Sequence, residues 1–438
     1  MRVYFESYGC TQNLGEGHAL ERGAAEAGHA VVHDPAQADV AVLVSCGVIA
    51  ATEARMARRW RALSAQVPHV VLTGCLVPLR SSALTGPGLE RTHLLPIRDQ
   101  PRLPELLDRL GPAPSAAGAS VPEPPALAAE VILAQGCTSG CAYCFSRLAR
   151  GPLSSVPAPG VLAGVRSAVA RGAREVRLSA LDTAAWGEDR PDGERLPDLL
   201  RAVSGLEGEF TVRVGMMSPQ SLLPIAPEYF AALDHPRFFQ FLHLPLQSGS
   251  DPVLAAMHRG YTVEQFRTCV REARRRLPSI LLSTDLIVGY PTEGEEEFRA
   301  SLAIVGELAP EIVNVTRFSP RPMTPAARLA PWPPGVVKRR SRELTALRMR
   351  TARQRLERWV GHEGSALPLE RGPYRSTVAR LPNYLPVVLA EEPPLGVPCT
   401  VRVDGCRSTY LLGHVLPAGG MRGDRTPLVD RSKYSMPA

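Results

Sequence analysis

The sequence predicts an α/β protein with three folded parts: an N-terminal doubly wound, flavodoxin-like domain, a central partial (β/α) barrel, and a small, OB-like antiparallel β-barrel. Three observations support this prediction. Strand-like and helical segments alternate in two series, a stretch rich in Pro, Ala and Ser separates the two, and only short strands follow the last long helix. The length of 438 residues agrees with two or three domains of ~150 residues each.

Residues 1–112 form the first series, in which short apolar runs alternate with helical patterns. Continuous apolar strands of this kind are typical of a parallel sheet covered on both faces. The predicted strands are residues 3–5, 31–32, 40–44, 70–73 and 94–96, and the predicted helices are 14–27, 52–66 and 101–110. Residues 113–126 have no periodicity and predict a linker.

Residues 127–358 form the second series. Six strand–helix repeats in about 200 residues indicate a full or partial barrel. The predicted strands are 130–134, 175–178, 210–214, 239–242, 280–287 and 312–315, and the helices between them include 161–171, 197–203, 263–275 and 295–308. A long helix over 337–358 carries nine Lys and Arg against Glu343 and Glu357, which indicates either a solvated face or a surface for a polyanion.

Residues 359–418 change to short strands, which predict the small β-barrel. The strands are 365–369, 375–379, 385–389, 399–403 and 410–415. Residues 419–438 are polar and predict a tail.

The composition excludes several classes of protein. Nine cysteines are too few for a disulfide-stapled scaffold. The first residues lack a signal peptide pattern, and no run of about 18 apolar residues predicts a membrane span. We therefore expect a cytoplasmic protein whose cysteines serve as metal ligands or nucleophiles. The net charge of +7 indicates a polyanionic partner such as nucleic acid. The 48 Arg among the 50 basic residues are explained mainly by a GC-rich genome, which encodes Arg in place of Lys.

Three cysteines lie within eight residues of QGCTSGCAYCFSR: Cys137, Cys141 and Cys144. They follow the predicted strand 130–134, at the carboxyl end where barrel sites form. Soft thiolates select zinc, copper(I) or an iron–sulfur cluster, and three ligands leave one metal position open. A zinc site and three packed structural cysteines stay open as alternatives.

Three further cysteines, Cys10, Cys46 and Cys75, each lie just past a predicted strand, 36 and 29 residues apart. The carboxyl ends of parallel strands meet at one edge of a sheet, where ligands bind. The three thiols are therefore expected to converge on a second centre with an open position, although a lone buried cysteine is usually a small apolar residue. Cys269, Cys399 and Cys406 are interpreted as structural.

The spacing of the first set, with the aromatic Tyr143 before its last cysteine, matches the loop by which radical S-adenosylmethionine (SAM) enzymes bind a 4Fe–4S cluster. Together with the second set, it resembles the methylthiotransferase family of radical SAM enzymes. YGCTQN resembles the form seen in the archaeal and eukaryotic tRNA branch, and PNYLPVVL and YLLGHV resemble the RNA-binding TRAM domain. Further blocks that resemble the family are residues 243–262, 283–298 and 318–327.

Two segments depart from the family pattern. After YGCTQN the family usually continues with an Asp-Ser-Glu block, whereas this chain reads LGEGHALE. The segment SCGVIAATEARM lacks the Asn-Thr that commonly precedes Cys46 in this resemblance. Both changes lie near the second set of cysteines.

The resemblance implies two 4Fe–4S clusters and SAM as cofactors. Cys137, Cys141 and Cys144 would hold the cluster whose reduction splits SAM into methionine and a 5′-deoxyadenosyl radical, and Cys10, Cys46 and Cys75 would hold an auxiliary cluster that delivers sulfur. Contacts to SAM or substrate are expected from Tyr143, Ser179, Asp182 and Gln247. Arg213 pairs either with a ligand carboxylate or with a structural Asp or Glu, and His243 is either a core residue or a contact.

The expected reaction inserts CH3–S at C2 of threonylcarbamoyl-adenosine at position 37, in the tRNA anticodon loop. Two alternatives remain: a methylthiotransferase acting on a ribosomal protein side chain, and a non-catalytic iron–sulfur RNA-binding or electron-transfer paralogue. A monomer and a small electron donor such as a ferredoxin or flavodoxin are expected.

Overall fold

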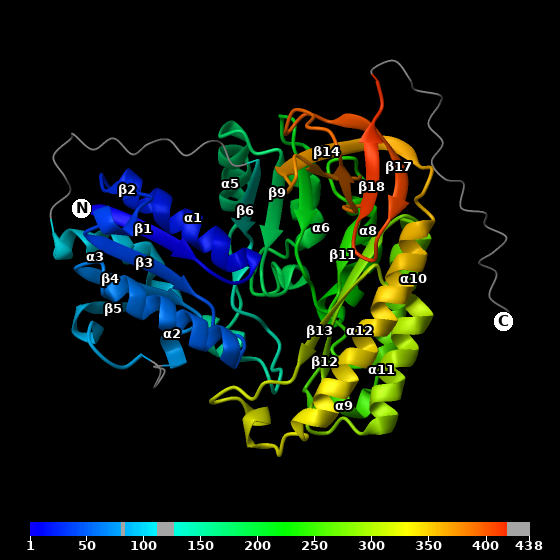
Figure 1. Ribbon diagram of the computed structural model, residues 1–438, viewed down its shortest axis with the longest axis horizontal. Helices are drawn as coiled ribbons and strands as arrows, with labels where there is room; N and C mark the ends of the chain where they lie inside the picture. Colours follow the sequence, from blue (N-terminus) through cyan, green and yellow to red (C-terminus); the bar gives the residue numbers. More distant parts are fainter. Residues whose placement is uncertain (80–83, 112–126, 418–438) are drawn as a thin grey trace.

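The computed structural model describes residues 1–79, 84–111 and 127–417, and it contains three units side by side (Figure 1). The predicted linker 113–126 and tail 419–438 lie outside these residues. None of the helices in the described ranges is both long and apolar enough to cross a bilayer.

The N-terminal unit is a five-stranded parallel sheet in the order β2-β1-β3-β4-β5. This order is that of flavodoxin-like folds, so the predicted doubly wound class is confirmed. The strands are β1 (Arg2–Ser7), β2 (Ala30–Val32), β3 (Val40–Ser45), β4 (His69–Gly74) and β5 (Thr92–Leu95), and the helices are α1 (Thr11–Glu26), α2 (Ala50–Ser64) and α3 (Leu103–Leu110).

Strand β3 explains why this sheet needs covering on both faces, because all six of its residues are buried. Val40 and Val42 pack with Leu20 of α1 in one apolar cluster, whereas Ala41 and Leu43 pack with residues of α2 in another. The continuous apolar run of the sequence is thus shared between two layers of helices.

The central unit contains two three-stranded parallel sheets, in the orders β10-β9-β6 and β11-β12-β13, connected through a bridge between Val212 and Phe238. Its strands are β6 (Ala128–Ile132), β9 (Glu175–Ser179), β10 (Thr211–Val214), β11 (Phe241–His243), β12 (Leu281–Val288) and β13 (Ile312–Arg317), with the short pair β7 (Ala134–Gln135) and β8 (Ser154–Ser155). Its helices are α4 (Phe145–Arg150), α5 (Ala158–Ala170), α6 (Leu196–Ser204), α7 (Pro219–Leu222), α8 (Ala226–Leu233), α9 (Asp251–Ala256), α10 (Val263–Arg276), α11 (Glu295–Leu308) and α12 (Pro334–Glu357).

Local sequence sets the ends of these helices. Thr262 accepts the Gln265 N–H at 3.2 Å while the Gln265 side chain accepts the Thr262 N–H at 2.9 Å, which is a capping box at the start of α10. Helix α12 begins at Pro334, where the missing N–H of proline costs nothing.

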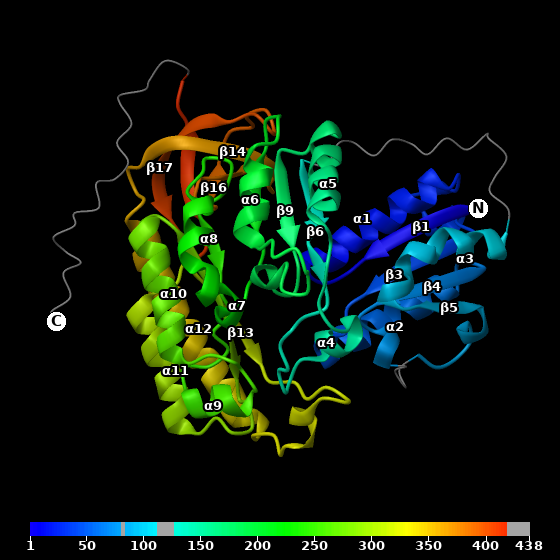
Figure 2. The same ribbon diagram turned by 180° about the vertical axis from the view of Figure 1, so that it is seen from behind.

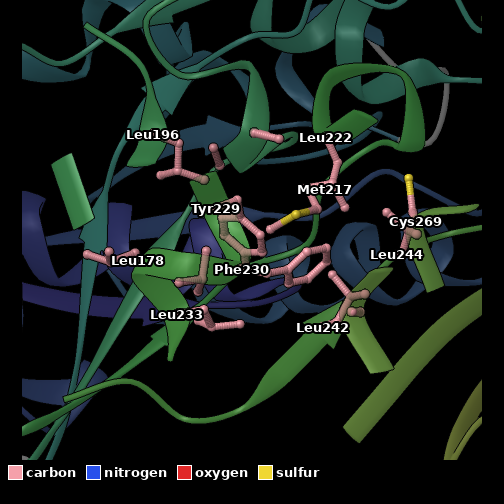
Figure 3. Close-up of a cluster of buried hydrophobic side chains, with 14 of the residues drawn as sticks. Leu178, Leu196, Met217, Leu222, Tyr229, Phe230, Leu233, Leu242, Leu244 and Cys269 are labelled. Atoms are coloured by element: carbon pink, nitrogen blue, oxygen red, sulfur yellow. The ribbon is translucent and has the colours of Figure 1, made fainter. Parts of the chain in front are cut away.

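A large apolar core fills the space between the strands and helices of this unit. Figure 3 shows part of it, with Tyr229 and Phe230 of α8 between Leu178 of β9 and Leu242 of β11. Cys269 lies fully buried in the same core, and burial raises the pKa of its thiol to about 12. This placement agrees with the structural role expected for Cys269.

The C-terminal unit is a closed five-stranded barrel in the order β14-β15-β16-β18-β17. Its strands are β14 (Glu363–Arg371), β15 (Thr377–Arg380), β16 (Pro386–Leu389), β17 (Cys399–Cys406) and β18 (Leu411–Val415). Four neighbouring pairs are antiparallel, whereas β16 and β18 are parallel. An odd number of strands that alternate in direction cannot close without one parallel pair, so the wholly antiparallel arrangement expected from the sequence is corrected at this point.

This small barrel covers the amino ends of the central strands (Figure 1). Phe241 and Leu281, the first residues of β11 and β12, share an apolar cluster with Tyr384 and Leu385 of the barrel. The Tyr384 hydroxyl donates to the Glu175 carboxylate at 2.7 Å, and Glu175 is the first residue of β9. The opposite, carboxyl ends of the central strands are therefore the ends left for a site.

Helix α1 lies between the N-terminal sheet and β6 of the central unit, as Figure 2 shows. A Cβ on Gly15 would lie 2.8 Å from the Glu130 Cβ in β6, and one on Gly17 would lie 1.9 Å from the Ser7 Oγ in β1. The two glycines allow α1 to pack closely against a sheet on each side. They belong to LGEGHALE, the segment that departs from the family pattern.

Candidate functional site

The first set of cysteines lies in one loop between β7 and α4. Gly136 begins this loop with φ +71°, and a Cβ there would lie 1.9 Å from the Pro152 carbonyl oxygen. Only glycine permits so close an approach. The loop is closed by the Cys137 N–H, which donates to the Gly151 carbonyl at 3.3 Å.

Two features of the loop shift the pKa values of these thiols in opposite directions. Burial raises the pKa of both Cys137 and Cys144. Backbone N–H groups oppose this effect by favouring the thiolate, and the Ser139 N–H lies 3.4 Å from the Cys137 Sγ. The loop therefore holds thiols that can become thiolates when a metal centre displaces their protons.

Arg259 provides a positive charge at the same loop. Its Nη1 donates to the Cys141 Sγ at 2.9 Å, while its Nε donates to the Tyr261 hydroxyl at 3.1 Å. The guanidinium also lies 4.9 Å from the centre of the Tyr261 ring. No local sequence pattern identifies Arg259 as part of this site, because the contact joins residues 118 positions apart.

The second set of cysteines follows three neighbouring strands of the N-terminal sheet. Cys10 follows β1, Cys46 follows β3 and Cys75 follows β4. The chain order reverses between β1 and β3, which is the ligand-binding position in doubly wound sheets. The three cysteines therefore lie in loops at one edge of the sheet, and their convergence on one centre stays a prediction.

Close packing brings the loops of this second set together. A Cβ on Gly9, whose φ is +116°, would lie 2.9 Å from the Cys46 Cβ. The Cys75 N–H donates to the Ser45 carbonyl at 2.9 Å. Burial raises the pKa of Cys75 to about 12, with the Arg150 guanidinium acting in the opposite direction.

Asn13 connects these loops to one another and to the central unit. Its Nδ2 donates to the Tyr8 carbonyl at 2.7 Å and to the Ser45 carbonyl at 3.1 Å. Its Oδ1 accepts a hydrogen bond from Arg150 at 2.5 Å and lies 4.0 Å from the Cys75 Sγ. The last residues of YGCTQN therefore hold the second thiol set in place.

The donor sets fit iron–sulfur clusters. Each set offers three soft thiols and leaves one metal position to another ligand. Within residues 1–79, 84–111 and 127–417, no three His, Cys, Asp or Glu side chains converge closely enough to hold a single metal ion. Each set also has a buried arginine beside it, Arg259 or Arg150, whose charge compensates an anionic centre.

Two of the residues expected to contact a cofactor lie past the carboxyl end of β9. Ser179 ends that strand and is buried. Asp182 is 2% exposed, and its carboxylate accepts hydrogen bonds from the Ser218 N–H at 3.0 Å and the Ser221 hydroxyl at 2.8 Å. Burial raises the pKa of Asp182. The negative charge of Asp182 in turn raises the pKa of Cys137, so Asp182 lies near the loop that carries the first set of cysteines.

Gln247 and Tyr143 also lie at this end of the barrel. The Gln247 backbone pairs with β12 beyond the end of β11, and its φ of +70° is uncommon for a residue other than glycine. Tyr143 packs edge-on against Tyr290, with 6.5 Å between ring centres. Their assignment to SAM stays a prediction.

Arg213 lies nearer the opposite end. Its guanidinium carbon is 5.1 Å from the centre of the Phe241 ring and 5.3 Å from that of Tyr384. Its charge also lowers the pKa of Glu175. This placement favours the structural alternative weighed for Arg213. His243 faces Asp285, with 3.0 Å between the Nε2 and the carboxylate.

The basic helix α12 contains two kinds of arginine. Arg340 is buried, and its Nη1 lies 3.0 Å from the Glu293 carboxylate. Arg355 is half-buried, and its Nε lies 2.7 Å from the Glu311 carboxylate. Other cationic side chains of the helix are exposed: Lys338, Arg339, Arg342, Arg350, Arg353 and Arg358. The helix is thus partly a structural element and partly a charged surface.

Comparison with known families gives two matches. The radical SAM superfamily matches residues 131–305, and the uncharacterized protein family UPF0004 matches residues 2–89. Among solved structures, a radical S-adenosylmethionine methyltransferase, TsrM, from Kitasatospora setae is similar in fold, with a TM-score of 0.56 and 13% identity over 74% of this chain and 76% of that one.

Curated relatives cover nearly the whole chain. Probable threonylcarbamoyladenosine tRNA methylthiotransferases are 34% identical in Pyrococcus abyssi, over 95% of this chain and 100% of the relative, and 35% identical in Methanothermobacter thermautotrophicus, over 94% and 99%. The threonylcarbamoyladenosine tRNA methylthiotransferase of Danio rerio is 31% identical over 96% of this chain and 79% of its own length.

Proposed function

The chain belongs to the threonylcarbamoyladenosine tRNA methylthiotransferase family of radical SAM enzymes, and we propose that it inserts CH3–S at C2 of threonylcarbamoyl-adenosine at position 37 of tRNA. The observation that carries this proposal is the pair of three-thiol sites, in a chain that matches those relatives over about 95% of its length. When bound, two 4Fe–4S clusters and SAM supply the radical hydrogen abstraction and the sulfur that no acid–base side chain supplies.

The protein's part in this proposal is to hold the two centres and to balance their charge. Cys137, Cys141 and Cys144 would hold the cluster that binds SAM, with Arg259 donating to Cys141. The hydrogen bond would reduce the negative charge on the sulfur, because the guanidinium is a cationic donor to that ligand atom. Cys10, Cys46 and Cys75 would hold the auxiliary cluster.

SAM itself would lie at the carboxyl ends of the central strands. Ser179, Asp182 and Gln247 supply polar groups at this end, and Tyr143 supplies an aromatic ring. Asp182 is held in place by Ser218 and Ser221. A ligand amine or ribose hydroxyl is the chemical complement of such a carboxylate.

The tRNA would bind through the exposed cations of α12 and the small β-barrel. Lys338, Arg342 and Arg350 are exposed and suit phosphate contacts, which are strongly salt-dependent. An unpaired anticodon-loop base can then be read at the barrel mouth. A tRNA substrate implies the cytoplasm, and we propose a monomer that receives electrons from a small donor such as a ferredoxin or flavodoxin.

Nucleoside mass spectrometry of tRNA tests the substrate. Deleting the gene should abolish 2-methylthio-threonylcarbamoyl-adenosine, and expression of the wild-type chain, but not of a C137A/C141A/C144A variant, should restore it. An unchanged level of this nucleoside after deletion would contradict the proposal and favour a ribosomal protein as the target. Loss of a methylthio derivative of dimethylallyladenosine instead would contradict the threonylcarbamoyl assignment.

Iron content and SAM cleavage test the chemistry. Two 4Fe–4S clusters correspond to about eight iron atoms per chain. The reduced protein should release 5′-deoxyadenosine from SAM under anaerobic conditions. No release from protein with its full iron content would favour a non-catalytic iron–sulfur protein.

A further inference from the structure

Helix α4 extends from one thiol site to the other. It begins directly after Cys144 and ends at Arg150, a span of six residues or about 9 Å. Arg150 is 8% exposed, and its guanidinium crosses from the central unit into the N-terminal unit. An arginine of the first site's helix therefore reaches the second thiol site.

The partner of this arginine is Glu16, on the helix that begins at Cys10. Arg150 Nη1 contacts the Glu16 carboxylate, and Nη2 lies 3.1 Å from the other Glu16 oxygen, so that the pair is bidentate. The Glu16 side chain is 3% exposed. Gln135 completes the network, accepting from Arg150 at 2.8 Å and donating to Glu16 at 2.7 Å.

The same guanidinium lies beside the second thiol site, although it belongs to the central unit. Its Nη2 donates to the Asn13 Oδ1 at 2.5 Å, and the Cys75 Sγ lies 4.0 Å from the same oxygen. Burial by itself would lower the pKa of Arg150, but the charges of Glu16, Cys75 and Cys10 outweigh this effect and raise it. Arg150 therefore stays cationic beside these thiols, and Glu16 places a negative charge on its other side.

A second buried pair also connects the two units but differs in its surroundings. Arg321, in the segment after β13, lies 2.7 Å from Glu53 of α2 and is 3% exposed. Arg150 is among the charges that act most strongly on both the Cys46 and Cys75 thiols, whereas Arg321 is not. The Arg321–Glu53 pair thus serves as a matched control for domain docking without the charge effect.

We propose that the Glu16–Arg150 pair, formed across the two domains, sets the reduction potential of the auxiliary centre on Cys10, Cys46 and Cys75. This inference rests on the auxiliary cluster of the proposed function. Reduction adds a negative charge to a cluster, so a nearby cation stabilises the reduced form and a nearby anion destabilises it. Arg150 is a positioning residue in this proposal and contacts no substrate.

The test uses the full chain carrying C137A/C141A/C144A, so that only the auxiliary centre contributes to the spectrum. Its reduction potential is measured by redox titration followed by electron paramagnetic resonance. R150M should shift the potential to lower values and E16Q to higher values, because they remove charges of opposite sign. R150K should lie closer to the parent than R150M, and the double variant E16Q/R150M should lie between the two single variants.

The R321M variant is the control for weakened docking of the two units. R321M should leave the potential unchanged, because it weakens domain docking without removing a charge from the centre. Shifts in the same direction for R150M and E16Q, or no shift in either, would overturn the inference. If R150M does not fold, E16Q decides alone: a higher potential supports the inference and an unchanged one overturns it. If the parent C137A/C141A/C144A protein does not contain about four iron atoms per chain, the auxiliary cluster of the proposed function is overturned instead.

Discussion

Arg259 donates a hydrogen bond to the Sγ of Cys141 over 2.9 Å, although the two residues are 118 positions apart in the chain. Removing this donor should impair the first centre. We expect R259M to reduce the rate of 5′-deoxyadenosine formation roughly 10–100-fold, as is common for residues that hydrogen-bond to metal ligands. Iron content measured in parallel shows whether the cluster is still present.

Two further variants serve as comparisons for R259M. R259K keeps the charge but loses the fixed fork of donors, so its rate should lie between those of R259M and the wild type. R267M removes a half-buried arginine of α10 that is paired with Glu307 of α11, and it should leave the rate unchanged. A wild-type rate for R259M would show that the hydrogen bond to Cys141 is dispensable.

The Tyr384 hydroxyl should stabilise the contact between the small barrel and the central unit. Y384F leaves the ring in place but removes the 2.7 Å hydrogen bond to the buried Glu175. Glu175 keeps its hydrogen bonds from Arg177, so the expected cost is that of one hydrogen bond to a charged group, about 1.5–3 kcal/mol. Urea denaturation should show this loss, whereas Y374F, at a residue 99% exposed, should not change the free energy of unfolding.

Glu175 should also contribute to the pH dependence of stability. Burial alone would raise its pKa, but the hydrogen bond and charge of Arg177, with Tyr384 and Arg213, outweigh burial and lower it. A lowered folded-state pKa means that the contribution is complete above the unfolded carboxyl value of about 4.3 and is lost as the pH falls through the folded value. The free energy of unfolding should therefore fall more steeply below about pH 4.3 in the wild type than in E175Q. Equal slopes would contradict this.

The exposed face of α12 should bind phosphate groups of tRNA. The variant K338Q/R342Q/R350Q should weaken tRNA binding and reduce the slope of log Kd against log salt concentration by about one per lost contact. R201Q, at an exposed arginine of α6 that is paired with Asp198, is the control and should bind normally. An unchanged salt dependence in the triple variant would assign α12 to a solvated face.

The expectation of two thiol sites follows from local patterns in the sequence. Cys10, Cys46 and Cys75 follow apolar strands, and parallel strands place their carboxyl ends together regardless of other detail. The three-domain fold class followed from the same periodicity.

What the sequence did not predict depends on contacts between distant segments. Glu16 lies in LGEGHALE, which as a sequence is only a departure from a family pattern, and its partner Arg150 lies 134 residues away. The sequence leaves the partner of Arg213 open between a ligand carboxylate and a structural Asp or Glu. In the fold its charge acts on Glu175, and its guanidinium lies over two aromatic rings, one of them supplied by the C-terminal barrel. Neither relationship leaves a signal in spacing or composition.

The position of α1 between two sheets limits how this protein can be recombined. Gly15, Glu16 and Gly17 fit the surfaces of two different units in consecutive positions. A chimera that joins the N-terminal unit of one homologue to the central unit of another would have to match both surfaces at once. The two units should therefore be exchanged together in such chimeras, even though each has its own sheet and its own apolar core.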